Sequence, residues 1–89
     1  MASIVCAQRL GNVGPLERVI YQGETVRDVL DAAAADYPRL KNYVLDDQGR
    51  VRKHVAIFVG GGMQPREIVL DTMLGAADEI YIMQALSGG

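Results

Sequence analysis

The chain has 89 residues, 49% of them hydrophobic, and a formal net charge of −2 at pH 7. This length predicts one domain with one core and leaves little surface for a deep catalytic cleft. The acidic balance argues against nucleic acid as a main partner, because phosphate binding needs a basic surface. A single cysteine, no signal-peptide pattern and no apolar run of membrane-spanning length lead us to expect a cytoplasmic protein without a membrane partner.

Two strands joined by a turn-rich loop are the first predicted elements. Residues 3–7 are apolar at both parities, which predicts a strand that is buried on both faces. Residues 11–15 have the Gly, Asn and Pro composition of a turn. Residues 17–22 carry apolar side chains on both sides and predict a second strand. We therefore expect a hairpin with a long connection.

A helix follows, and its start has a clear local signal. The Thr25 hydroxyl can accept a hydrogen bond from an early amide, and Asp28 stands where a capping box usually has Glu or Gln. Pro38 ends the helix, because the residue before proline disfavours helical geometry. The apolar residues at the spacing of one helix face are Val26, Val29, Leu30, Ala33, Ala34 and Tyr37. The pattern predicts a helix that packs on one side.

The second half of the chain is mainly strands. Residues 40–45 predict a short helical turn tucked under the fold, and the β-branched run Val55–Val59 predicts a strand that residues 60–62 break. Residues 68–70 predict a short edge strand. Residues 79–83 predict the last strand, with Ile80 and Ile82 on one face and Tyr81 and Met83 on the other. Residues 84–89 predict a flexible tail.

This order of elements predicts the fold. Strand, strand, helix and then two or three strands indicate an α+β domain over residues 1–89, with its helices on one face of the sheet. A single helix that crosses a twisted sheet is the β-grasp, or ubiquitin-like, arrangement. We expect a mixed sheet of four to five strands. The first and last strands, both apolar on two faces, should lie side by side in its middle.

None of the candidate catalytic groups forms a convincing constellation. The glycines 60–62 lack the Lys and Ser or Thr that complete a phosphate-binding loop. Cys6 and His54 could pair as nucleophile and base, but Cys6 falls in a predicted core strand, where cysteine acts as a small hydrophobe. One Cys and one His do not supply the three or four ligands of a metal site, so we expect no metal.

Three charged clusters have simple interpretations. Residues 50–54 form a basic cluster, for which a solvated strand entrance is favoured over a nucleic-acid patch. Asp46-Asp47 and Asp78-Glu79 lie in predicted turns, where Asp forms local backbone bonds. We expect Asp78-Glu79 to place surface charge near the tail.

The tail is the strongest functional candidate. A frayed terminus is its plain interpretation. However, it leaves a predicted central strand, so its base is anchored, and its two glycines have no side chains and can enter a narrow channel. The sequence therefore predicts that the protein acts through the C-terminal carboxylate of Gly89, with Gly88, Ser87 and Leu86 as the tail that presents it.

The sequence resembles the MoaD/ThiS-type ubiquitin-like sulfur carriers, which include the small subunit of molybdopterin synthase and the thiamine and cysteine-synthesis carriers. The stretches that carry the resemblance are residues 25–30, 55–59, 70–74, 77–82 and 85–89. Two positions depart from the family pattern. Residues 60–62 stand where an Asn-Gly type turn is usual, and Gln84 stands where a proline often precedes the tail, which would loosen the tail's base.

The resemblance implies a protein co-substrate rather than an enzyme, with no bound cofactor. A ubiquitin-activating-type adenylyltransferase would use ATP to adenylate Gly89, and a sulfur donor would displace AMP and leave a thiocarboxylate. An acceptor enzyme would then use the sulfur in the biosynthesis of a cofactor or metabolite. The pathway stays open, and the small subunit of a synthase such as molybdopterin synthase is one form of this role.

Docking of these partners needs a surface near the tail. Phe58, Tyr81 and Met83 are the candidates, because aromatic residues and Met are favoured at interface centres. The alternative is that they are core residues, since parity alone does not decide which face is outward. Three other functions stay open: a ubiquitin-like protein modifier, a non-catalytic β-grasp interaction domain and a small enzyme that uses Cys6.

Overall fold

The structure is a computed structural model, and it describes residues 2–85. These residues contain one five-stranded sheet in the order β2-β1-β5-β3-β4. Its strands are β1 (Ala2–Cys6), β2 (Val19–Tyr21), β3 (Val55–Val59), β4 (Gly62–Met63) and β5 (Glu79–Gln84). β1 and β5 pair in parallel and the other neighbours are antiparallel, so the sheet is mixed. The first and last strands lie side by side, as predicted, with β5 in the middle.

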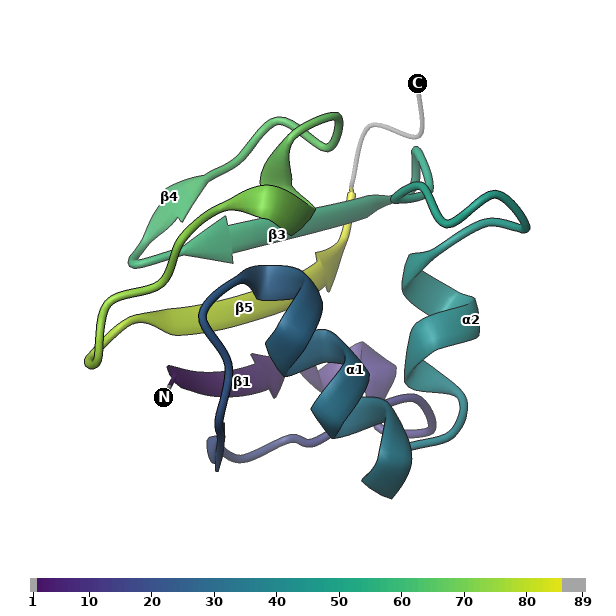
Figure 1. The fold of residues 1–89 in the computed structure, drawn as a ribbon. Helices are drawn as coiled ribbons and strands as arrows, with labels where there is room; N and C mark the ends of the chain where they lie inside the picture. Colours follow the sequence, from purple (N-terminus) through teal and green to yellow (C-terminus); the bar gives the residue numbers. More distant parts are fainter. Residues whose placement is uncertain (1, 86–89) are drawn as a thin grey trace.

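The main helix, α1 (Val26–Asp36), lies across one face of this sheet (Figure 1). The predicted capping box is present: the Asp28 N–H donates to Thr25 Oγ1 at 3.2 Å, and the Thr25 N–H donates to the Asp28 carboxylate at 3.3 Å. The Glu24 N–H also donates to this carboxylate and, as the main cause, lowers the pKa of Asp28. Tyr37 caps the other end, directly before Pro38. The α+β β-grasp prediction is confirmed.

The core fills the space between α1 and the sheet. β5 contributes Ile80 and Ile82, each 1% exposed, and β1 contributes Ile4 and Cys6. A short helix, α2 (Leu40–Val44), buries Leu40 and Val44 beside them, as the sequence predicts. Cys6 is tightly enclosed, since a Cβ atom at Gly14 would lie 2.7 Å from its sulfur. This packing explains why glycine occupies position 14.

The predicted edge strand at residues 68–70 is wrong. Val69–Asp71 forms a 3-10 helix, η2, after another such helix, η1 (Gln8–Leu10), in the first loop. The Val69 N–H donates to Pro65 O at 3.0 Å, so this amide does not need a strand partner. Val69 and Leu70 are both buried while Ile68 is exposed, and two consecutive buried side chains suit a helical turn better than a strand on one face.

The edge strand is instead β4, which pairs with β3 through a tight turn. Gly60 and Gly61 have φ angles of +60° and +87°. A two-residue hairpin turn with both φ angles positive is the type I′ geometry that Asn-Gly and Gly-Gly sequences favour. The departure from the family's usual turn sequence therefore leaves the turn geometry intact.

The last strand is longer than predicted. Gln84, assigned from sequence to the tail, is the final residue of β5 and lies opposite Val55 of β3. The next residue continues this pairing, because the Ala85 N–H donates to the His54 carbonyl at 2.8 Å. The loosening expected from Gln84 is therefore not observed at this position. Leu86, Ser87, Gly88 and Gly89 lie outside the described residues, and their predicted roles stay predictions.

Candidate functional site

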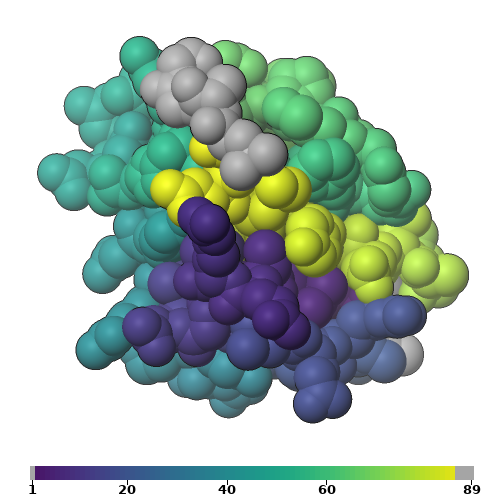
Figure 2. All heavy atoms as spheres, turned by 180° about the vertical axis from the view of Figure 1, so that it is seen from behind, coloured from purple at the N-terminus to yellow at the C-terminus, as the bar shows by residue number. Residues whose placement is uncertain are grey.

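The face of the sheet that α1 leaves uncovered carries a row of apolar side chains. In register, Val5 of β1 lies opposite Tyr81 of β5, Tyr81 opposite Phe58 of β3, and Phe58 opposite Met63 of β4. Met83 lies two residues beyond Tyr81 and therefore on the same face. We call these five side chains the helix-free patch. The space-filling view from behind shows β5 at the centre of this surface, between β1 and the β3–β4 hairpin (Figure 2).

Two aromatic residues form the middle of the helix-free patch. The Phe58 and Tyr81 ring centroids are 6.3 Å apart with an interplanar angle of 68°, an edge-to-face contact. Phe58, Tyr81 and Met83 are half-buried, and none of them belongs to the core cluster. The structure thus places the three predicted docking residues together on the open face rather than in the core.

Sequence reasoning missed two members of this patch. Met63 is 66% exposed and enters the row because β4 pairs with β3. The signal was present: a two-glycine turn after a strong strand predicts a hairpin, which brings the residue after the turn back beside Phe58. Val5 was missed because residues 3–7 alternate apolar side chains on both faces, and only the pairing with β5 shows which of them join the open face.

The root of the tail is held at the end of β5. The pairing of Gln84 with Val55 and the bond from Ala85 to His54 fix the last two described residues to β3 and to the residue before it. His54 also contacts Tyr43 through an edge-to-face ring pair with centroids 5.3 Å apart. Any segment that follows Ala85 therefore begins from a fixed point beside the turn that precedes β3.

The acidic pair Asp78 and Glu79 is not near the tail, and that expectation is wrong. Asp78 directly precedes β5 and Glu79 is its first residue, and at about 3.3 Å per residue a six-residue strand separates its two ends by roughly 17 Å. Asp78 accepts the Gly75 N–H at 2.7 Å, and Glu79 pairs with Arg18 at 2.9 Å. The charge of this pair is used locally, at the far end of the sheet.

The remaining turn prediction is confirmed at Asp46. Its carboxylate accepts the N–H groups of Gln48 at 2.9 Å and Arg50 at 3.0 Å. The bond from Arg50 is the largest cause of its lowered pKa. Such bonds to backbone amides hold a turn and leave no carboxyl poised for acid–base chemistry.

The arrangement around Cys6 does not suit a nucleophile. Its side chain is 3% exposed, and burial raises the pKa of the thiol to about 11. A catalytic cysteine needs its thiolate, which this environment disfavours. No hydrogen bond joins Cys6 to His54 within residues 2–85. The described part of the chain also contains no group of three or more His, Cys, Asp or Glu side chains placed to hold a metal ion.

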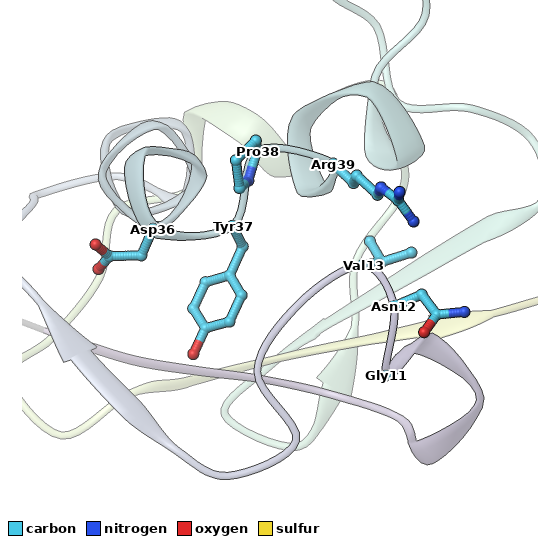
Figure 3. Close-up of a pocket in the computed structure, with 7 residues that line it drawn as sticks. All are labelled: Gly11, Asn12, Val13, Asp36, Tyr37, Pro38 and Arg39. Carbon is cyan, nitrogen blue, oxygen red and sulfur yellow. The ribbon is translucent and has the colours of Figure 1, made fainter.

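A small pocket is an alternative candidate site to the helix-free patch. It has a volume of about 230 Å³ and lies between the loop after η1 and the connection from α1 to α2 (Figure 3). Tyr37 and Asp36 line one side of it and Arg39 and Asn12 the other. Small-molecule sites usually enclose about 300–1,000 Å³. None of its residues belongs to the helix-free patch or to the root of the tail.

Comparison with known proteins assigns the family. The sequence model of the ThiS family matches residues 8–89, which is nearly the whole chain. The chain belongs to the ThiS family. No curated protein sequence matches it at a significant level. Within the described residues of this ThiS-family chain, no helix is long and apolar enough to cross a membrane.

Solved structures agree with the family assignment. SAMP1 from Haloferax volcanii is 27% identical, covers 99% of this chain and 98% of its own, and has a TM-score of 0.74. CysO from Mycobacterium tuberculosis is 19% identical, covers 97% and 100%, and has a TM-score of 0.81. CysO in the Amycolatopsis orientalis BexX/CysO complex is 16% identical, covers 100% of both chains, and has a TM-score of 0.80. The two CysO structures support the fold alone. This ThiS-family chain has the ubiquitin-like fold of small sulfur carriers and modifiers.

Proposed function

We propose that this protein is a sulfur carrier that works through the carboxylate of Gly89. The observation that carries the proposal is the family match, which runs to Gly89 and includes the strand that leads into the tail. The geometry around that strand supports it, because β5 pairs with β1 up to Ile82 and with β3 up to Gln84, and so offers the following residues from a fixed base. The protein would then be a co-substrate, and ATP would be used by its activating partner.

The proposed chemistry has three steps. An adenylyltransferase of the ubiquitin-activating type joins the Gly89 carboxylate to the α-phosphate of ATP and releases pyrophosphate. A carboxylate is a poor electrophile, and the acyl adenylate makes its carbon open to attack. Hydrosulfide, or a donor that supplies it, then attacks this carbon and displaces AMP, which leaves a thiocarboxylate. On an acceptor enzyme of cofactor or metabolite biosynthesis the sulfur passes to the substrate, and water then supplies the oxygen that replaces it at the Gly89 carbonyl and regenerates the carboxylate.

The helix-free patch is the proposed docking face for these partners. The five apolar side chains of the patch lie outside the core, and contiguous apolar surface of this kind marks interaction sites. Tyr81 and Phe58 are at its centre, where hot-spot aromatics are usually found. The BexX/CysO complex has a partner bound to a protein of this fold. That complex supports the expectation of a partner enzyme for this chain.

The test is intact mass spectrometry of the protein after incubation with ATP, sulfide and the activating enzyme of its host. We expect a species heavier by one oxygen-to-sulfur exchange, located at Gly89 by fragmentation. The matched control is a variant that lacks Gly89, and it should show no such species. If wild-type protein keeps the mass of the plain sequence under these conditions, sulfur transfer is wrong.

A second function is favoured by one observation. SAMP1, at 27% identity, is a small archaeal modifier protein, so this chain is a candidate modifier joined through Gly89 to lysines of other proteins. Immunoblots of host lysates should then show bands that survive boiling and reduction and that vanish in the variant without Gly89. An absence of such bands, together with a thiocarboxylate, would leave sulfur transfer as the function.

A further inference from the structure

A basic cluster lies at the root of the tail. Arg52, Lys53 and His54 immediately precede β3, and the His54 carbonyl holds the Ala85 N–H at 2.8 Å. Figure 1 shows the segment before β3 beside the end of β5. A protein that encloses the residues after Ala85 must therefore bring the rim of its binding channel over this turn.

Two charges in this cluster have no acidic partner within the described residues. Arg18, Arg27, Lys41, Arg50 and Arg66 each form an ion pair with an Asp or Glu. Arg52 and Lys53 form none among residues 2–85. The Arg52 Nε atom donates to the carbonyl of Asn42 at 3.1 Å, which holds the guanidinium in place without neutralising it. Lys53 is exposed.

The same residues line a hollow in the surface. Its volume is about 360 Å³, and its lining is Asp46, Arg50, Val51, Arg52, Lys53, His54 and Arg66. Four of these side chains are Arg or Lys, and one is acidic. Arg66 Nη1 donates to the Val51 carbonyl at 3.0 Å, which keeps its guanidinium at the wall of the hollow. A positively charged site of this size fits carboxylate side chains, because the planar guanidinium group matches the geometry of a carboxylate.

We propose that this basic hollow, defined by Arg50, Arg52, Lys53 and Arg66, docks acidic side chains on the rim of the partner that receives the tail. The proposal rests on the tail-dependent function proposed above and adds a second contact to it. The helix-free patch supplies apolar contact area, and the basic hollow orients the tail toward its channel. Charges at an interface rim act mainly on the association rate and its salt dependence.

A protein partner fits better than nucleic acid. The chain as a whole carries a net charge of −2, so a polyanion would meet repulsion away from the hollow. A rim with a few carboxylates covers only the hollow and meets no such repulsion. The position of the cluster beside Ala85 also ties it to the receiver of the tail, which is a protein in the proposed function.

The test compares Lys53→Glu with Arg39→Glu. Arg39 is also exposed and without an ion pair among residues 2–85, but it lies at the start of α2, so both changes alter net charge equally in different places. The readout is the association rate constant with the host's activating enzyme, measured by stopped-flow at several salt concentrations. We expect Lys53→Glu to lower this rate about tenfold at low salt, with the deficit shrinking as salt rises, and Arg39→Glu to change it by less than about twofold. The double variant Arg52→Glu/Lys53→Glu should be slower still.

Equal rates for Lys53→Glu, Arg39→Glu and wild type would overturn the inference while leaving the tail chemistry intact. Wild-type protein that the activating enzyme neither binds nor adenylates would overturn the proposed function and this inference together. Fluorescence anisotropy with a short single-stranded oligonucleotide provides a further check. Wild-type binding at physiological salt that Lys53→Glu abolishes would assign the hollow to nucleic acid instead.

Discussion

The two faces of the sheet are built by alternate residues of the same strands, yet they differ in burial. On β5, Ile80 and Ile82 face α1 and are 1% exposed, whereas Tyr81 and Met83 face the other way and stay half-buried. The helices cover one face only, so the apolar side chains of the second face have no covering element in the described chain. The comparison teaches that this sequence carries more apolar side chains than its core needs, and that five of them lie side by side on the open face.

The largest effect should come from the covered face. Ile82→Ala removes a fully buried side chain between α1 and the middle strand, and we expect a loss of about 2–5 kcal/mol in the free energy of unfolding. Urea denaturation followed by circular dichroism measures it. Met83→Ala, the next residue on the other face, is the matched control and should cost clearly less. Equal losses of stability would mean that the two faces do not differ in burial.

The open face should respond in binding rather than in stability. Tyr81→Asp places a charge at the centre of the helix-free patch, and a hot-spot loss of about 2 kcal/mol would lower kcat/KM for activation roughly 30-fold. ATP–pyrophosphate exchange measures this value, and a thermal melt verifies the fold. Ile68→Asp is the control, since Ile68 is 58% exposed but lies outside the patch. Normal activation of Tyr81→Asp would show that the partner docks elsewhere.

The pH dependence of stability should reveal how well the covered face excludes water. Burial raises the pKa of Cys6 from 9.0 to about 11, so between these values the unfolded chain loses a proton that the folded chain retains. Stability from this group is complete below pH 9 and is lost as pH rises toward 11, by up to about 2 kcal/mol. The difference between the urea midpoints at pH 8 and pH 10.5 should therefore be smaller in Cys6→Ala than in wild type. An identical pH profile for the two proteins would show that the thiol is hydrated.

The smallest effect should come from the turn that holds Met63 over the open face. Gly60 has φ +60°, and a Cβ atom there would lie 3.4 Å from Asp78, which is ordinary contact. Gly60→Asn should thus be accommodated and raise stability by less than about 1 kcal/mol, because Asn restricts the unfolded chain. Chemical denaturation measures the change. Gly61→Val, a β-branched residue at φ +87°, should lower stability instead, and a gain there would contradict the turn geometry.

Local signals in the sequence were enough to predict the elements that depend on neighbours along the chain. Thr25, Asp28 and Pro38 bound α1 because capping and proline geometry act within one turn. The short strand β4 was missed because it is two residues long and has no alternation to read. Residues 68–70 were misassigned because three apolar residues in a row suit a strand and a buried helical turn equally.

In the candidate site too, local features could be predicted from the sequence and long-range features could not. The residues Phe58, Tyr81 and Met83 could be chosen from sequence by type, but their common face is set by strand pairing, which is a long-range property. The expectation that Asp78-Glu79 lies near the tail was wrong because it did not take the length of β5 into account. The role of Gly89 stays a prediction from sequence and family.

The central position of β5 has a consequence for the order in which the molecule is made and folds. The pairs Ser3–Glu79 and Cys6–Ile82 join segments that are almost a chain length apart, so the loop-closure entropy of the whole domain opposes them. Without β5, neither β1 nor β3 has its inner neighbour. During synthesis the sheet therefore stays incomplete until the strand before the tail has emerged. A nascent chain, or one truncated before β5, cannot present the assembled helix-free patch to a partner. A folded sheet therefore always includes the strand that leads to Gly89.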